Sequence, residues 1–202
     1  GVSLGQIREE IAQAELRGDT IPKSMTKADY AEYRFESALA EEDDFDMLVM
    51  GRTQGKGCYC YVNGVLKTLL DKYIGAYRYV VIDNEAGMEH IARGTLPHVD
   101  ALLLVSDCSR RGVQAVARIA EMVRELDLKP GLMKLIINRA PGGVLSDGVR
   151  EEIEAHHLEL AGVLPQDDAV YEADCDGKPS SKIPDASPVK QALHGIMQDL
   201  SL

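Results

Sequence analysis

The sequence predicts an α/β fold in which helices flank a doubly wound, mainly parallel sheet. Two observations support this prediction: apolar runs alternate with segments of helical spacing, and each run is continuously apolar, as in strands buried on both faces. The order of strand, helix and strand requires parallel pairing through crossover connections. The 202 residues are 45% hydrophobic, which is sufficient for one domain spanning residues 1–202.

The predicted strands are five segments that each end in a polar or glycine-rich turn. They are DMLVMG (46–51), YRYVVIDNEAG (77–87), DALLLVSD (100–107), LMKLIINRA (132–140) and LAGVLPQ (160–166). Because these runs do not alternate between apolar and polar residues, both faces of each strand are expected to be covered.

Helices are predicted between and after the strands, where apolar residues recur at helical spacing. They are expected over residues 65–73, over 113–126, within 141–157 after a turn, and over 184–200 with one apolar side. The first 40 residues are acidic, with a weak helix at 4–17 and a loop after it.

The charge balance argues against two classes of partner. The formal net charge is −11 at pH 7, and acidic residues gather in EEDDFD (41–46). Such a surface repels phosphate backbones and anionic lipid, so neither nucleic acid nor a membrane is expected as a partner. The chain has no apolar run of about eighteen residues, and its start lacks the basic and apolar regions of a secretory signal. A cytoplasmic protein is therefore expected.

Polar residues at the ends of predicted strands are the first candidates for a ligand site. In doubly wound sheets ligands bind beyond the carboxyl ends of the strands, where Asp83, Asp107 and Asn138 are expected. In a phosphate-handling enzyme, an aspartate placed as Asp83 is can hold Mg²⁺ through water, and a glycine placed as Gly87 is lets the backbone approach a terminal phosphate. The same pattern also fits an aspartate that only caps the next turn, so both interpretations remain open.

Two strand ends have features of a nucleotide base site. The Asn138 carboxamide offers a donor and an acceptor to the edge of a purine, although an isolated asparagine there also suits a turn. Pro165 and Asp167 follow the last predicted strand, as in loops that close over a base. The segment GRTQGKG (51–57) does not fit a phosphate loop, because it has one residue too few between the glycines and lacks the following serine or threonine.

Cys58 and Cys60 stand one residue apart in the segment GKGCYCYVNG. Residues i and i+2 of an extended segment point the same way, so the two thiolates can face one metal ion and supply half of a tetrahedral site. In a two-fold dimer the two pairs would supply four sulfurs, a set that accepts zinc, nickel or an iron-sulfur cluster. The alternative is two small residues in a glycine-rich turn. Cys108 and Cys175 lack a neighbouring ligand and are expected to have no chemical role.

Four motifs together resemble a known family. They are GKGCYC, VVIDNEAGMEHIARGT, LIINRA and GVLPQDDAV, in this order. In them the chain resembles the CooC-type nickel-insertion ATPases that mature carbon monoxide dehydrogenase, within the deviant-Walker group that also holds the nitrogenase iron protein and the MinD/ParA ATPases. The resemblance covers essentially the whole chain, and its most specific parts are the Cys58-Tyr59-Cys60 motif and the stretch from Ala86 to Thr95.

This resemblance implies a P-loop NTPase-like fold, ATP or ADP with Mg²⁺ as cofactor, and a homodimer. It implies that Cys58 and Cys60 bind nickel or zinc at the dimer interface. Asp83 would lie on the Mg²⁺ side, and Gly87 would lie in the switch that senses the γ-phosphate. Asn138 and Pro165 would line the adenine pocket, and the apoprotein of carbon monoxide dehydrogenase would be the partner.

The chain departs from the family pattern at its beginning. Such proteins open with a strand, a K-G-G-x-G-K-T phosphate loop and a helix, then a second strand that ends in aspartate, and the sequence contains none of these. Roughly 45 residues, about one and a half βα units, are expected to be absent. ATP hydrolysis is therefore implied by the resemblance alone, because the phosphate loop that would support it is missing from the chain.

The function that the resemblance implies is an ATP-dependent metallochaperone that delivers nickel to carbon monoxide dehydrogenase. Two other functions remain open. One is electron transfer through an iron-sulfur cluster held between two chains, and the other is a non-catalytic dimeric module that binds metal or docks on the dehydrogenase. A partitioning or division-site ATPase would share the fold, but a basic surface or an amphipathic membrane tail would be expected.

Overall fold

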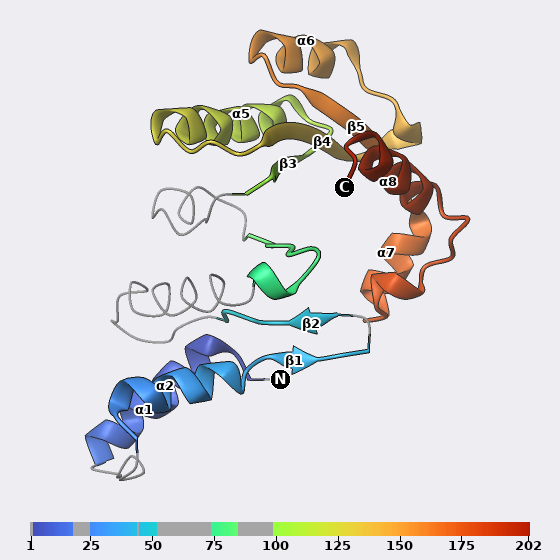
Figure 1. Cartoon of the computed structure of the whole chain (residues 1–202). Coiled ribbons are helices and arrows are strands. Elements are labelled where there is room, and N and C mark those ends of the chain that lie inside the picture. Colours follow the sequence, from blue (N-terminus) through green and yellow to red (C-terminus); the bar gives the residue numbers. More distant parts are fainter. Residues whose placement is uncertain (1, 18–24, 44, 52–73, 85–98) are drawn as a thin grey trace. The chain divides into compact units, whose positions relative to one another are not determined.

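A computed structural model describes residues 2–17, 25–43, 45–51, 74–84 and 99–202 (Figure 1). The chain divides into two compact units, Gly1–Asn84 and Glu85–Leu202, called here the amino-terminal and carboxy-terminal units. In the described part of the chain, no helix has both the length and the apolar character needed to cross a bilayer.

The carboxy-terminal unit is built on a parallel sheet of three strands in the order β3–β4–β5. The strands are β3 (Ala101–Asp107), β4 (Leu132–Ala140) and β5 (Leu160–Pro165). β3 and β4 pair in unbroken register from Ala101 opposite Leu132 to Asp107 opposite Asn138. The three strands and their parallel pairing confirm the predictions for residues 100–107, 132–140 and 160–166.

Helices cover both faces of this sheet, as Figure 1 shows. The crossover helices α5 (Arg110–Glu125) and α6 (Asp147–Ala155) lie on one face, and α8 (Pro188–Asp199) packs on the other. Between β5 and α8 come α7 (Asp168–Cys175) and the short turn η3 (Ser180–Lys182), while η2 (Pro141–Gly143) follows β4. The doubly wound α/β arrangement predicted from the sequence is thereby confirmed for this unit.

The main core lies between the sheet and the pair α5 and α6. Its fully buried members include Val113 and Ala120 of α5 and Leu135, Ile137 and Ala140 of β4. A smaller cluster on the opposite face joins Ile136 of the sheet to Ile196 of α8. Neighbouring residues of β4 therefore face different helices, which explains why its apolar run is continuous.

A buried carboxylate links the two crossover helices. Glu152 of α6 is 7% exposed, and its Oε2 accepts hydrogen bonds from Arg110 Nε at 2.9 Å and from Nη2 at 2.7 Å. Its Oε1 accepts from Gln114 Nε2 at 2.8 Å and lies 3.2 Å from His156 Nε2. The Gln114 and Arg110 hydrogen bonds hold the pKa of Glu152 below its ordinary value, so the carboxylate stays charged and joins α5 to α6.

The described part of the amino-terminal unit contains two helices and a short pair of strands. They are α1 (Leu4–Arg17), α2 (Lys27–Glu36), β1 (Ala40–Glu41) and β2 (Asp46–Met47), with the turn η1 (Ile74–Ala76) later in the unit. Leu4, Ile7, Phe35 and Ala38 form its buried cluster. The predicted helix at 4–17 is confirmed, whereas α2 occupies part of the predicted loop. Thr26 starts α2 through a capping box with Asp29.

The two strands predicted in this unit differ from the structure. Within residues 46–51 only β2 is a strand, and it pairs antiparallel with β1, while the carbonyls of Val49 and Met50 accept hydrogen bonds from the first N–H groups of α1. Residues 77–84 form no strand, and Val81 is 91% exposed. A buried strand needs a neighbouring strand to which its backbone groups can hydrogen-bond. In the described part of this unit, no strand pairs with residues 77–84. The helix predicted at 65–73 lies outside the described residues.

Candidate functional site

The carboxyl ends of β3, β4 and β5 bring several candidate residues to one edge of the sheet. Asp107 at the end of β3 is opposite Asn138 of β4, and Ala140 of β4 is opposite Pro165 of β5. Asn138 and Pro165, which the sequence assigned to a base site, therefore lie at the same edge. This is the edge at which doubly wound sheets bind their ligands.

A β-bulge in β4 shapes this edge. Ile137 pairs with Val163 and Ala140 pairs with Pro165, so three steps along β4 match two steps along β5. The extra residue is accommodated by Arg139, whose φ of 57° lies in the left-handed region. Ile137 and Ala140 both point into the core beneath α5 and α6. The bulge therefore places both Asn138 and Arg139 outside the face of the sheet that α5 and α6 cover.

The Asn138 carboxamide is oriented by the bulge itself. Its Oδ1 accepts a hydrogen bond from the Arg139 N–H at 2.9 Å. Among the described residues the Nδ2 amino group of Asn138 has no partner, and the side chain is half-buried. The amide can therefore donate two hydrogen bonds to a ligand, and its oxygen keeps a second lone pair for accepting one.

Two contacts connect the neighbouring strand ends at the bulge. The Cys108 thiol, just after β3, donates to the Arg139 carbonyl with an Sγ to O distance of 3.5 Å. The Gln166 N–H, just after β5, donates to the Ala140 carbonyl at 2.9 Å. Cys108 thus has a structural role at this edge, which its isolation in the sequence did not indicate.

Asp107 is held at the start of α5. Its Oδ1 accepts from the Ser109 N–H at 3.0 Å and from the Ser109 hydroxyl at 2.6 Å, and these bonds hold the pKa of Asp107 below its ordinary value. Gly112 makes this arrangement possible, because a Cβ at that position would lie 2.2 Å from the same oxygen. The carboxylate is exposed at the candidate edge and stays ionised at neutral pH.

Asp167 connects the loop after β5 to two helices. Its Oδ1 accepts from the Ala169 N–H at 2.9 Å and so caps α7, while its Oδ2 accepts from the Ser187 hydroxyl at 2.6 Å and the Val189 N–H at 3.4 Å at the start of α8. The Ser187 hydrogen bond is the main reason that the pKa of Asp167 lies below its ordinary value. Both oxygens thus have partners within the protein, and a direct role in binding a nucleotide stays a prediction.

The other predicted site residues are distributed differently. Asp83 is an exposed residue of the amino-terminal unit. Gly87, Cys58 and Cys60 lie outside the described residues. In the part of the chain that the structure describes, no group of three or more histidine, cysteine, aspartate or glutamate residues could hold a metal ion. Arg139 and Ser187 are site residues that the sequence did not reveal, since a bulge and a contact across twenty residues depend on tertiary pairing.

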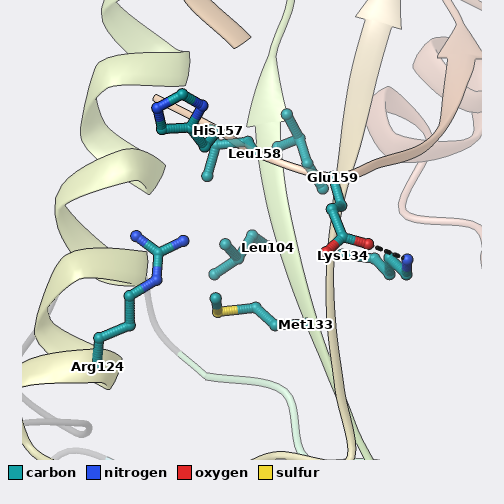
Figure 2. A pocket seen from close by; sticks show the side chains of 8 residues that line it. Leu104, Arg124, Met133, Lys134, His157, Leu158 and Glu159 are labelled. Atoms are coloured by element: carbon teal, nitrogen blue, oxygen red, sulfur yellow. Dashed lines mark hydrogen bonds and ion pairs between the residues drawn. The ribbon is translucent and has the colours of Figure 1, made fainter. Parts of the chain in front are cut away.

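A small pocket lies away from this edge, beside the beginning of β4 (Figure 2). Arg124, Met133 and Leu158 are among its lining residues, with the ion pair of Lys134 and Glu159 at its border. Its volume of about 30 Å³ is far below the roughly 300 to 1,000 Å³ of typical ligand pockets. The pocket has room for ordered water only, so it does not compete with the carboxyl edge as a nucleotide site.

Comparison with known proteins identifies relatives along nearly the whole chain. No protein-family profile matches. The chain is 35% identical to an uncharacterised ATP-binding protein of Methanocaldococcus jannaschii over 200 residues, which cover 98% of the chain and 78% of that protein. It is 32% identical to the carbon monoxide dehydrogenase accessory protein CooC of Rhodospirillum rubrum over 147 residues, which cover 70% of the chain and only 54% of CooC.

Solved structures agree on the fold. The septum site-determining protein MinD of Pyrococcus horikoshii, determined as a complex with Mg-ADP, matches 99% of the chain and 73% of its own length with a TM-score of 0.61. At 16% identity this likeness concerns the fold alone. The relatives in sequence and the doubly wound sheet lead to one conclusion: the chain belongs to the MinD/ParA family of deviant-Walker ATPases.

Proposed function

We propose that this protein is an ATP-dependent metallochaperone that delivers nickel to carbon monoxide dehydrogenase. The proposal has two parts, a nucleotide site at the carboxyl edge of β3, β4 and β5, and a metal-carrying site at Cys58 and Cys60. The single observation that carries the nucleotide part is the Asn138 carboxamide, which is oriented by the bulge and has an amino group without a partner among the described residues.

The chemistry of this edge fits the base of an adenine nucleotide. An amide with a free donor and a free lone pair can meet the paired donor and acceptor on the edge of adenine. Pro165 lies at the end of the neighbouring strand, and Asp167 holds the loop after it against α7 and α8. The name of the Methanocaldococcus jannaschii relative, an ATP-binding protein, supports a nucleotide ligand.

Fewer residues of this chain are candidates for binding the phosphates of the nucleotide. The exposed carboxylate of Asp83 has the hard oxygen chemistry that Mg²⁺ requires, and Gly87 is proposed to approach the terminal phosphate through its backbone. Bound Mg²⁺ would neutralise charge on the phosphates. The residues of this chain thus fit the base and supply two candidates for the phosphate side.

The metal part of the proposal treats nickel as cargo. Cys58 and Cys60 from two copies of the chain would supply four thiolates, which bind nickel or zinc. A closed dimer, favoured while nucleotide is bound, would bring the thiolates together, and opening would release the metal to the dehydrogenase apoprotein. The similarity to CooC over 70% of the chain supports this assignment.

The experiment that tests the proposal compares cysteine variants in metal loading. Cys58→Ser and Cys60→Ser should each reduce bound nickel or zinc from one ion per dimer to none, measured by elemental analysis and native mass spectrometry. Binding of a fluorescent ATP analogue should stay unchanged in both. Cys175→Ser is the matched control, because Cys175 is an exposed cysteine at the end of α7 and should leave metal binding intact. Unchanged metal content in the two site variants would contradict the proposal.

A further inference from the structure

The bulge in β4 places two neighbouring polar side chains at the candidate site. In a regular strand Asn138 and Arg139 would point to opposite faces. Here Ile137 and Ala140 are both buried in the core under α5 and α6. The two residues between them therefore both lie outside the face of the sheet that these helices cover. Bulges beside active sites commonly redirect a side chain in this way.

The backbone of Arg139 is held in a conformation that arginine rarely adopts. Its φ of 57° is normal for glycine and disfavoured for a residue with a Cβ. The Arg139 N–H donates to Asn138 Oδ1 at 2.9 Å, and the Arg139 carbonyl accepts from the Cys108 thiol at 3.5 Å. Both backbone groups are therefore satisfied, and the surrounding strand ends maintain the disfavoured conformation.

Among the described residues, no contact of the Arg139 side chain explains this cost. It is exposed, and it has no hydrogen bond or ion pair with any residue that the structure describes. Arg110 in the same unit, by contrast, makes two hydrogen bonds to Glu152. A positive φ alone does not distinguish Arg139 from His157, but Arg139 also lies at the candidate edge beside Asn138 and has no partner among the described residues, which makes it a candidate for contact with a ligand.

We propose that the Arg139 guanidinium packs against the face of the nucleobase whose edge meets Asn138, an inference that rests on the proposed nucleotide site. Arginine is suited to this contact, because its planar and weakly hydrated group stacks on aromatic rings. The two residues then recognise different properties of the base. Asn138 distinguishes one purine from another by hydrogen bonding, whereas Arg139 strengthens binding of any aromatic base.

The test measures affinity and stability in the same variants of the full chain. Arg139→Gly should weaken binding of both ATP and GTP by about threefold to thirtyfold, by similar factors, because it removes a stacking contact. Binding of inorganic tripolyphosphate, which has no base, should not change. The melting temperature should stay the same or rise, since glycine accepts the positive φ without strain. Asn138→Ala should instead change the ratio of ATP to GTP affinity.

Two controls separate the base contact from charge and from backbone strain. Arg139→Lys keeps the charge but not the plane, so it should lose most of the affinity that Arg139→Gly loses. His157→Gly relieves a similar φ of 52° just before β5, at the opposite end of the strand from Pro165, and should leave nucleotide binding unchanged.

The possible results lead to different conclusions. Unchanged ATP affinity in Arg139→Gly would overturn the inference while leaving the nucleotide site intact. An equal loss of tripolyphosphate binding would also overturn it, because the contact would then be with phosphate. Absence of nucleotide binding by the unsubstituted chain would overturn the proposed nucleotide site, and the inference with it.

Discussion

At Gly162 of β5, α8 approaches the sheet closely. A Cβ added there would lie 2.5 Å from both Cδ1 and Cγ1 of Ile196, well inside the 3.4 Å at which ordinary contact begins. Ile196 is 6% exposed and packs on Ile136, so it cannot move away without disturbing the core on this face. We therefore expect Gly162→Ala to push α8 away from the sheet.

The magnitude follows from two opposing effects. Overpacking a core by one methyl group costs about 1 to 3 kcal/mol, and replacing glycine in a strand recovers about 0.5 to 1 kcal/mol of chain entropy. Gly162→Ala should therefore lower the free energy of unfolding by up to about 2.5 kcal/mol. Ile196→Ala should lower it by about 2 to 5 kcal/mol, because it leaves a cavity.

The double variant provides the decisive measurement. With Ile196 shortened, the Gly162→Ala methyl group fills part of the cavity, so the two losses should be less than additive by about 1 to 2 kcal/mol. Urea unfolding followed by far-ultraviolet circular dichroism gives the three free energies. Losses that add to within about 0.5 kcal/mol would refute the close approach of β5 and α8 at Gly162.

Two further predictions concern side-chain caps. Ser187→Ala should raise the pKa of Asp167 toward its ordinary value of 3.8, as measured by NMR titration of the carboxyl carbon, and the exposed Ser180→Ala is its control. Because folding lowers this pKa, the associated stabilisation is present above pH 3.8 and is lost as the pH falls below that value; the variant should lose this part of the acid dependence. A pKa for Asp167 that does not move would contradict the assignment. Thr26→Ala should destabilise α2 by about 0.5 to 2 kcal/mol and speed amide hydrogen exchange in Lys27–Glu36; unchanged exchange there would show that the capping box is dispensable.

Much of the carboxy-terminal unit could be predicted from local patterns. The apolar runs of β3, β4 and β5 and the spacing of α5 determine their own conformation, and the rule on carboxyl strand ends then brings Asn138 and Pro165 to one edge. The loop predicted after residue 17 misses α2, although Thr26 and Asp29 stand at capping-box spacing at its start.

The remaining features depend on contacts that no local pattern encodes. The bulge at Arg139 follows from the register between β4 and β5 and from the burial of Ala140, neither of which has a sequence motif. Val81 belongs to a run as apolar as those of the sheet, yet it is exposed, because a strand also requires a paired neighbour. The predicted metal ligands Cys58 and Cys60 stay a prediction, since they lie outside the described residues.

The carboxylate of Asp167 connects the last helix, α8, to the proposed nucleotide site. Asp167 lies in the loop after Pro165 and accepts hydrogen bonds both from Ala169 of α7 and from Ser187 and Val189 at the start of α8. A shift of α8 should therefore also change the conformation of that loop. A substitution on α8 that leaves the molecule folded can still change nucleotide affinity, without any contact to the nucleotide. Libraries that aim to alter base preference should therefore vary Ser187 and Val189 together with the residues at the edge of the sheet.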